Sequence, residues 1–485
     1  MQGIMTSELL FSGSLLYYIS EWAVRLVMLG IVIERRPLRS AMVWLLVIFF
    51  LPWPGLVLYL FIGENRLPHR RLKKRKALLD RLESEHTHFM KHMGNASSIV
   101  DQAFLPTITL AEKLGHMPIM LGNQATLLAN TQTVINQLIE DIDAAQHHVH
   151  LLFYIFSIDE TGQRVCAALE RAVARGVTCR VLVDAQGSRQ FIKKMAPRLK
   201  TSGIKLYPSL PVSLLRAWVS RIDLRNHRKI VVIDGLIAYT GSQNIVDDGY
   251  GHKGLQWVDL MVRLTGPVVL ELQAVFAGDW VAENDEILES PEIFPDTSTP
   301  VDVNNAIQVL PSGPLSPSEN YQRMVVAALY AARHRVVITT PYFVPDEVFL
   351  EAIETAALKG VKVDLIVPLK SDQRLVDNAA KAYYERVLES GVNIYLFDAG
   401  LLHAKSMTID DSLAFLGSSN FDIRSFALNF EINVIFYGTE VADKLRKQQE
   451  YFRDHAQLLS LEKWRQRPHY QRITQNIIKL LSPVL

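Results

Sequence analysis

The sequence predicts an α/β protein built from two homologous halves and preceded by a helical membrane anchor. Three observations lead to this prediction. A set of six residue types recurs with identical spacing, strand-like and helix-like segments alternate in the same order twice, and the apolar excess gathers at the N-terminus. A chain of 485 residues also exceeds one ordinary domain. We expect an anchor at 1–64, a basic helical connector at 65–115, halves at 116–289 and 306–460 joined by a linker at 290–305, and an amphipathic tail at 461–485.

The first 64 residues contain two apolar segments. Segment 15–33 has only Glu21 and Arg25 as charges, and their i,i+4 spacing lets them pair on one helix face. Segment 42–62 has 21 residues and no charge, enough to cross about 30 Å of hydrocarbon, although its two prolines should kink it. We expect two transmembrane helices. A re-entrant hairpin and a pair of buried core helices are the alternatives.

A basic cluster follows the second apolar segment. Between residues 66 and 76 there are seven basic residues and no acid: Arg66, Arg70, Arg71, Lys73, Lys74, Arg75 and Lys76. Because the whole chain has a net charge of +1, the rest of it carries −6, which disfavours a globally basic nucleic-acid-binding protein. Positive charge beside apolar segments marks the cytoplasmic side. We therefore expect a multi-pass protein with its body and N-terminus in the cytoplasm, and the cluster against anionic headgroups.

The remaining polar signals point to no metal or redox site. Cys166 and Cys179 lie in apolar patterns without metal-ligand spacing, so we expect reduced thiols in the core. The segment HTHFMKH has three histidines, but their loose spacing favours a solvated polar segment over a metal site. Two amphipathic segments, 211–221 and 470–485, are open to two interpretations, as core-facing helices or as contacts with the lipid interface.

From about residue 120 the chain repeats itself. AAQHHVHLLFYIF (144–156) corresponds to AARHRVVITTPYF (331–343), and RGVTCRVLVDA corresponds to KGVKVDLIVPL further along both halves. The runs 149–156 and 336–340 are largely apolar and are predicted to be central strands. The same segments in the same order predict two α/β halves related by an approximate twofold axis.

The motif that indicates chemistry is HRKIVVIDGLIAYTGSQN, which recurs as HAKSMTIDDSLAFLGSSN. The first copy places six residue types at fixed gaps: His227, Lys229, Asp234, Gly241, Ser242 and Asn244. The second copy repeats them with the same gaps: His403, Lys405, Asp410, Gly417, Ser418 and Asn420. Two identical spacings in matching halves exclude an accidental pattern.

Strand geometry predicts that the members of each motif converge. Residues two apart in an extended strand point the same way, so His227 and Lys229 share one face. The Asp-Gly step after the strand favours a tight hairpin, which returns the serine and the asparagine to the histidine. An imidazole, an ammonium and two short hydrogen-bonding groups form a phosphate-binding set, and the repeat supplies this set twice.

Two histidines in one site suit phosphodiester exchange. One neutral imidazole attacks phosphorus, and the other, protonated, gives a proton to the leaving alkoxide. The lysines and asparagines bind the non-bridging oxygens, so the reaction requires neither a metal nor a cofactor.

Each histidine also needs a carboxylate that fixes its tautomer. Asp259 follows the first motif in WVD, and Glu431 follows the second in NFE. The motif also groups Asp234 and Asp410 with the catalytic residues. For these two the alternative is a role in the turn, and for Asp259 and Glu431 it is that of ordinary carboxylates at strand ends.

At these residues the chain resembles the phospholipase D superfamily, whose HxK(x)4D(x)6GSxN motif it contains twice. The resemblance implies two phospholipase D-like α/β halves in a pseudo-twofold sandwich with the site between them. It also implies a two-step route through a phosphohistidine, with His227 as nucleophile and His403 as general acid and base.

The flanking segments narrow the resemblance. RRPLRSAMVWLLVIFFLPWPGLVLYLFIGENR, WVSRIDLRNHRK and SSNFDIRSFALNFE are similar to the bacterial cardiolipin synthases with two transmembrane segments. This likeness implies transfer of a phosphatidyl group from one phosphatidylglycerol to another at the bacterial inner membrane, giving cardiolipin and glycerol. The expected partners are anionic phospholipids and the membrane, without nucleic acid, and self-association stays open.

Other activities use the same motif. A membrane phospholipase D or a phosphatidyltransferase for another alcohol is the main alternative. A membrane-tethered nuclease is disfavoured by the negative charge of the body, and an inactive scaffold by the two intact motifs.

Overall fold

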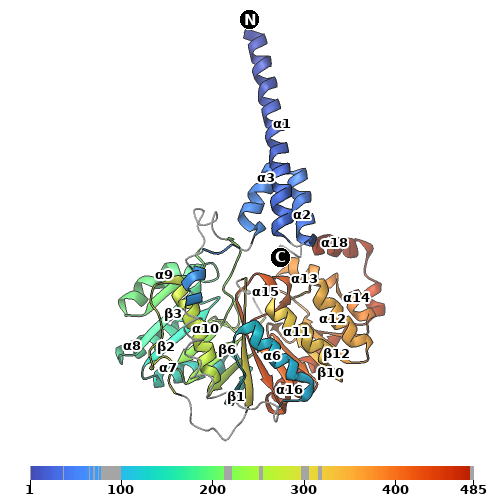
Figure 1. Cartoon of the computed structure of the whole chain (residues 1–485). Helices are drawn as coiled ribbons and strands as arrows, with labels where there is room; N and C mark the ends of the chain where they lie inside the picture. The colour runs from blue at the N-terminus through green and yellow to red at the C-terminus, as the bar shows by residue number, and fades with distance from the viewer. Residues whose placement is uncertain are drawn as a thin grey trace. The chain divides into compact units, whose positions relative to one another are not determined.

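The computed structural model describes residues 2–36, 38–64, 66–68, 71–74, 76–77, 100–211, 221–250, 255–296, 305–314 and 319–480. The chain forms two compact units (Figure 1). The N-terminal unit comprises Met1–Leu72 with Val212–Leu224, and the α/β unit comprises Lys73–Pro211 with Arg225–Leu485. The histidines of HTHFMKH, most of segment 211–221 and the end of the C-terminal tail lie outside the described residues.

The N-terminal unit is helical. It contains α1 (Gln2–Arg35), α2 (Leu38–Phe50), α3 (Pro52–Leu58) and the π-helix η1 (Tyr59–Gly63). The Ser14–Arg35 part of α1 is long and apolar enough to cross a membrane by length and composition, and most of its side chains are exposed. The expected ion pair between Glu21 and Arg25 forms at 3.4 Å.

The second apolar segment is not one continuous helix, and its crossing of the membrane stays a prediction. The helical conformation breaks at Leu51, and α3 begins at Pro52, whose ring cannot continue the preceding helix. α2 covers about 20 Å, and α3 together with η1 covers slightly less, so each is shorter than the ~30 Å of a hydrocarbon core. Among the described residues, only the α1 segment meets the length needed for a span.

α2 and α3 instead form a helical hairpin. A Cβ on Gly55 of α3 would lie 2.9 Å from Cα of Ile48 in α2, so the two helices approach as closely as glycine allows. Beyond η1, the carboxylate of Glu64 accepts hydrogen bonds from Arg35 at 3.3 Å and from Arg66 at 2.9 Å. The chain therefore leaves the hairpin beside the point where it entered, which is the re-entrant alternative.

The basic residues of segment 66–76 do not form one exposed patch. Arg71 is buried, and Lys74 pairs with Asp285 at 2.8 Å and donates to the carbonyl of Asn284 at 2.7 Å. Lys73 and Lys76 are exposed, whereas Arg70 and Arg75 lie outside the described residues. The expectation that all seven side chains face lipid is therefore wrong for at least Arg71 and Lys74.

The α/β unit contains the same strand arrangement twice. The first half contributes β1 (Met120–Leu128), β2 (His148–Phe153), β3 (Thr178–Asp184), β4 (Lys205–Ser209), β5 (Ile230–Ile233), β6 (Ile237–Gly241) and β8 (Met261–Thr265). The second contributes β9 (Asn305–Ser312), β10 (Arg335–Thr339), β12 (Lys362–Pro368), β13 (Asn393–Phe397), β15 (Ser406–Ile409), β16 (Leu413–Gly417) and β18 (Glu431–Tyr437), with β19 (Ala456–Leu458) at its edge.

The strand order runs from β4-β3-β2-β5-β6-β8-β1 in one half directly into β9-β18-β16-β15-β10-β12-β13 in the other. Each order is the mirror of its partner about the β1–β9 junction, where Asn123 faces Asn305. In both halves three parallel strands are followed by antiparallel ones. The predicted pair of homologous α/β halves is confirmed.

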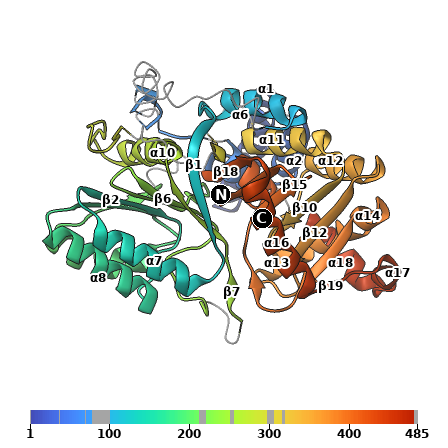
Figure 2. The same ribbon diagram turned by 90° about the horizontal axis from the view of Figure 1, so that it is seen from below.

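The strands of both halves form one continuous sheet, and helices cover both of its faces (Figures 1 and 2). The outer faces pack against α7 (Thr131–Ala144) and α8 (Glu160–Ala174) in one half and against α11 (Asn320–Ala331) and α12 (Glu347–Leu358) in the other. A shared core contains α10 (Val268–Glu283), α16 (Thr439–Asp454) and strand residues of both halves.

The side chains of β5 point alternately into two of these cores, so the sheet separates them. Val231 and Ile233 pack with α7 and α8, whereas Ile230 and Val232 face the shared core. A strand buried on both faces needs apolar side chains at every position, which explains the unbroken run IVVI of β5.

Three local predictions are confirmed. The runs predicted as central strands form β2 and β10. The Asp234–Gly235 step adopts φ values of 53° and 67°, as a tight hairpin between β5 and β6 requires. Both cysteines are buried and free, and burial raises the pKa of each thiol to about 12.

Two segments outside the repeat serve the α/β unit. The part of the connector that forms α6 (Leu105–Gly115) packs Ile108 and Ala111 into the core of the second half, so it is more than a linker. In the tail, α18 (His469–Lys479) packs Ile478 against the same core. Its other apolar side chains are exposed, as is the residue after it: Tyr470, Ile473, Ile477 and Leu480.

Candidate functional site

The two motif histidines meet because the halves exchange short backbone segments. β14 (Leu401–Leu402), just before His403, pairs with β7 (Trp257–Val258) of the first half, and His403 donates its N–H to the carbonyl of Val258 at 2.8 Å. In the same way, His227 donates its N–H to the carbonyl of Phe430 in the second half at 2.8 Å. Each histidine therefore lies against the segment that leads into the other half's carboxylate.

The histidine–carboxylate pairs cross between the halves. Nδ1 of His227 lies 3.0 Å from Oε2 of Glu431, and Nδ1 of His403 lies 2.6 Å from Oδ1 of Asp259. With Nδ1 bound to a carboxylate, Nε2 is the nitrogen left for chemistry. The sequence indicated the two carboxylates, whereas their pairing across 204 and 144 residues is visible only in the structure.

The motif serines support these carboxylates. Ser242 donates to Oδ1 of Asp259 at 2.6 Å and accepts the N–H of Leu260 at 2.9 Å. Ser418 donates to Oε2 of Glu431 at 2.5 Å and accepts the N–H of Ile432 at 2.9 Å. Both serines are fully buried, and their bonds to the carboxylates fit the supporting one of the two expected roles. Each serine ends a strand whose neighbour carries the carboxylate, and its hydroxyl bonds there.

The motif lysines lie beneath the histidines. Nζ of Lys229 donates to the carbonyl oxygen of His227 at 2.7 Å, and Nζ of Lys405 donates to that of His403 at 2.5 Å. Both are almost fully buried. Burial lowers the pKa of Lys229 to about 8 and that of Lys405 to about 7, despite the nearby carboxylates. Each ammonium has three N–H donors, so it can also bind an anion.

A cavity of about 340 Å³ opens over this cluster and is lined by both halves. The motif contributes both histidines and both asparagines, and the amide oxygen of Asn244 accepts the N–H of Ile155 at 3.1 Å. The further polar and aromatic lining residues include Tyr154, Arg225, Trp257, Tyr342, Asp372, Asp422, Arg424 and Asn429. The histidine and the asparagine of each motif therefore line one cavity, as the strand geometry predicted.

Asp234 and Asp410 lie away from the cavity, at the other end of β5 and β15 from the histidines. The carboxylate of Asp234 accepts the N–H groups of residues 146–148 at 2.7–2.8 Å. That of Asp410 accepts the N–H groups of residues 333–335 at 2.7–3.0 Å. Their grouping with the catalytic residues is corrected, because both fasten a hairpin turn to the start of the neighbouring strand.

The electrostatics favour neutral imidazoles beside charged carboxylates. Burial lowers the pKa of His227, and burial together with the charge of Lys405 lowers that of His403 to about 4. Burial alone would raise the pKa of Asp259, but the interactions with His403 and Lys405 outweigh it and lower that pKa to about 2. The same balance with His227 lowers the pKa of Glu431.

Sequence reasoning missed the buried arginine between the first histidine and lysine. Arg228 forms an ion pair with Asp279 of α10 at 2.6 Å. It also donates to the carbonyls of Glu431 and Ser312, at 3.0 and 3.1 Å, in the second half. Asp279, one of three acidic residues in the mainly apolar α10, was the available signal. Arg228 joins the two halves directly behind the histidine.

Aromatic rings flank both histidines. The ring of Tyr154 packs against His227 with centroids 4.8 Å apart, and that of Trp257 packs edge-on against His403 at 4.7 Å. These contacts fix the imidazole planes and cover them from solvent.

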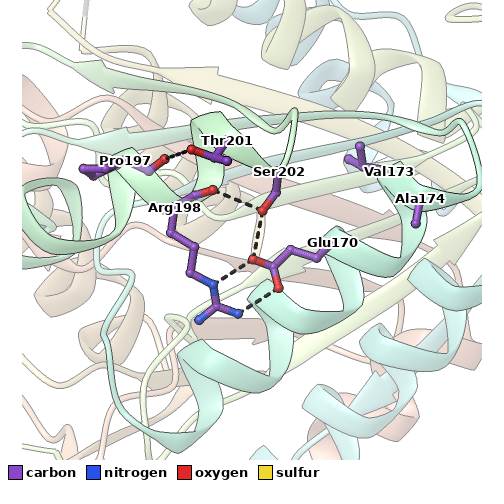
Figure 3. A pocket seen from close by; sticks show the side chains of 7 residues that line it. All are labelled: Glu170, Val173, Ala174, Pro197, Arg198, Thr201 and Ser202. Carbon is purple, nitrogen blue, oxygen red and sulfur yellow. Dashed lines mark hydrogen bonds and ion pairs between the residues drawn. The ribbon is translucent and has the colours of Figure 1, made fainter.

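A second depression on the surface is a weaker candidate for a functional site. A depression of about 680 Å³ lies between α8 and α9 (Arg189–Thr201), where Arg198 and Ser202 both bind the carboxylate of Glu170 (Figure 3). Its charged groups are bonded to each other. Within the part of the chain that the structure describes, no group of three or more His, Cys, Asp or Glu side chains could hold a metal ion.

Comparison with known proteins gives consistent results. Residues 138–280 and 325–453 match the family described as "Cardiolipin synthase, PLD-like domain", and residues 22–64 match "Phospholipase_D-nuclease N-terminal". The chain is 37% identical to Cardiolipin synthase A of Serratia proteamaculans (strain 568) over 472 residues, covering 95% of this chain and 96% of that protein. It is 38% identical to Cardiolipin synthase A of Yersinia pestis over 469 residues, with the same coverage.

The fold is also similar to the crystal structure of phosphatidylserine synthase from Haemophilus influenzae Rd KW20. The TM-score is 0.61 at 16% identity, covering 78% of this chain and 99% of that one. This likeness concerns the fold alone. The sequence matches span both halves, both motifs and the N-terminal helices. The chain therefore belongs to the cardiolipin synthase family of the phospholipase D superfamily.

Proposed function

We propose that this chain is a cardiolipin synthase that transfers a phosphatidyl group from one phosphatidylglycerol to another, releasing glycerol. The observation that supports this most is the pair of histidines from two halves, each bound to the other half's carboxylate, lining one cavity. The family supplies the reaction class, and phospholipids such as phosphatidylglycerol are its substrates.

In the first step, Nε2 of His227 attacks the phosphorus of the donor lipid. A P–N bond forms, the P–O bond to glycerol breaks, and His403 gives its proton to the departing glycerol oxygen. His403 is neutral in the empty site, but a bound phosphodiester anion raises its pKa because negative charge stabilises the imidazolium. Glu431 stabilises the positive charge that develops on His227.

In the second step, His403 accepts the proton of the acceptor hydroxyl. The hydroxyl oxygen attacks phosphorus, the P–N bond breaks and His227 is regenerated. Lys229, Lys405 and the two motif asparagines bind the non-bridging oxygens through both steps and offset the charge of the transition state. Two phosphatidylglycerols thus give one cardiolipin and one glycerol.

Membrane attachment favours transfer over hydrolysis. Water is present at about 55 M, so a lipid alcohol competes only when the site orients it and its effective concentration is high. An anchored enzyme meets its lipid substrates in the bilayer plane. The apolar face of α18, with Ile473, Ile477 and Leu480 exposed, is suited to contact with the same interface.

We further propose that α1 crosses the bacterial inner membrane once and that α2 and α3 re-enter it from the cytoplasmic side. Arg35 and Glu64 lie together at the two ends of the hairpin, which places the basic residues on both flanks at one level. Positive charge on that side favours the cytoplasm. The catalytic unit then follows in the cytoplasm, while the N-terminus lies outside.

This arrangement can be tested by cysteine labelling in intact cells. Both native cysteines are buried, so a maleimide should react selectively with a single cysteine that replaces Ser7 or Lys76. A membrane-impermeant maleimide should label Ser7→Cys in intact cells and Lys76→Cys only after permeabilisation. Protection of both positions in intact cells would show two full spans instead.

The activity itself is tested with the purified full-length chain. In mixed micelles with phosphatidylglycerol as the sole phospholipid, we expect cardiolipin and glycerol in equal amounts, measured by mass spectrometry and an enzymatic glycerol assay. Phosphatidic acid as the only lipid product would mean a phospholipase. Because acid hydrolyses the P–N bond of a phosphohistidine, the reaction is quenched in alkaline detergent. The quenched protein should carry the phosphatidyl adduct on His227, and an adduct on His403 would reverse the two roles.

The crossed carboxylates should affect turnover more than affinity. Asp259→Asn and Glu431→Gln keep the shape but remove the charge that orients each imidazole and stabilises its protonated form. We expect kcat to fall roughly 10²–10⁴-fold with KM changed little. Because each pair acts as a unit, Asp259→Asn combined with His403→Ala should be no worse than His403→Ala alone. Additive losses would contradict the pairing.

The pH dependence should reflect the buried lysines. Their pKa values of about 8 and 7 mean that the free enzyme loses both positive charges as pH rises through that range. Loss of these charges weakens phosphate binding, so kcat/KM should fall above about pH 7. The arginine of the Lys405→Arg variant keeps its charge at high pH. The remaining kcat/KM of this variant should therefore begin to fall at a higher pH than that of wild type. A wild-type profile that stays flat to about pH 10 would refute the assignment.

A further inference from the structure

The cavity contains two arginines that the internal symmetry does not repeat. Arg225 lies two residues before the histidine of the first motif, where the second motif has Leu401. Arg424 lies four residues after the asparagine of the second motif, where the first has Asp248. Both arginines line the cavity over the histidines, and both are half-buried. The charge of the cavity is therefore asymmetric although its reacting core is symmetric.

The two guanidinium groups come from different halves, but both line the cavity near Tyr154. Arg424 belongs to α15 (Ile423–Ala427), and Arg225 belongs to the segment that pairs with Phe430. Burial and the charge of Asp184 raise the pKa of Tyr154, and the positive charges of Arg225 and Arg424 oppose that rise. Both charges are therefore close to Tyr154, which itself packs against His227.

The cavity's two carboxylates are engaged by protein donors. Asp372 accepts the hydroxyl of Tyr342 at 2.7 Å. Asp422 accepts the N–H of Ser425 at 2.6 Å, as the N-cap of α15. The cavity therefore holds two arginines together with two carboxylates.

The charges of the reacting core balance without the two arginines. Lys229 and Lys405 are matched by Asp259 and Glu431, and protonation of one histidine matches one phosphodiester. The acceptor lipid brings a second phosphodiester, which the reacting phosphate repels. Residues that both halves share suit the reacting phosphate, which is contacted in the same way from either side. Residues present in only one half can distinguish the acceptor lipid from the donor lipid.

We propose that Arg225 and Arg424 form a second phosphate subsite, which binds the phosphate group of the acceptor while its hydroxyl reacts. This rests on the proposed function and deepens it by naming how the acceptor is recognised. The glycerol between the two phosphates of the product has only three carbons, so one cavity holds both. The proposed subsite does not depend on which of the two histidines is the nucleophile. Its ligand is a phosphate attached to an alcohol, in a lipid or in a soluble molecule.

The test separates acceptor binding from donor cleavage. Full-length Arg225→Ala and Arg424→Ala are assayed in phosphatidylglycerol micelles with three acceptors: labelled glycerol, glycerol 3-phosphate and phosphatidylglycerol itself. Exchange of labelled glycerol into phosphatidylglycerol requires the phosphohistidine but no second phosphate. We expect exchange within about twofold of wild type, and transfer to both phosphate-bearing acceptors reduced about 10-fold or more. Arg424→Lys should recover part of the loss.

The matched control is Arg198→Ala, which removes one arginine charge at the surface groove of Figure 3. It should leave all three activities unchanged, which separates the subsite from general attraction to anionic micelles. Equal loss of exchange and transfer in the cavity variants, or no loss of transfer, would overturn the subsite. Loss with phosphatidylglycerol but not with glycerol 3-phosphate would show contact with the lipid surface instead. Wild-type protein that exchanges glycerol but makes no cardiolipin would refute the proposed function and not this subsite.

Discussion

The hydrogen bond between each histidine and the carboxylate of the opposite half is the constraint on which the site depends. A histidine paired within its own half could keep its geometry in an isolated half. Here His227 needs Glu431 and His403 needs Asp259, so neither imidazole is oriented until both halves are folded and joined. The exchanged backbone segments bring these partners together, and Arg228 with Asp279 fastens the joint from behind. Folding and assembly of the catalytic pair are therefore one event.

The second constraint is electrostatic. Two ammonium groups and two carboxylates are almost fully buried in one cluster, an arrangement that is costly unless the charges balance. The neutral histidines keep that balance in the empty site. A phosphodiester adds one negative charge, and protonation of a single histidine restores neutrality. In the proposed mechanism, binding therefore prepares the general acid, because the substrate itself raises the pKa of the group that must donate the proton.

Much of this arrangement could be predicted from the sequence because local rules govern it. The repeat predicted two halves, the apolar runs predicted β2 and β10, and the Asp-Gly step predicted the hairpin that returns Asn244 to His227. The rest depends on contacts between segments distant in the sequence. Spacing could not show that Ser242 binds Asp259 and not phosphate, or that Asp234 binds the N–H groups of the neighbouring strand.

The N-terminal helices show the same limit in another form. Hydropathy correctly located the apolar run after residue 41 but could not tell a span from a hairpin. Leu51 and Pro52 break the helix, and Gly55 lets the two pieces pack closely, so the run folds back on itself.

The internal repeat also explains why chemistry and selectivity reside in different residues. A duplicated half supplies two copies of each phosphate-binding group, and symmetry suits a phosphorus atom that is approached from one side and left from the other. Symmetry cannot distinguish the two lipids, because the same group would meet either one. Discrimination must come from positions where the copies have diverged, such as Arg225 against Leu401 and Trp257 against Asn429. Divergence at the rim is tolerated because the core beneath it, with its crossed carboxylates, fixes the reacting groups independently.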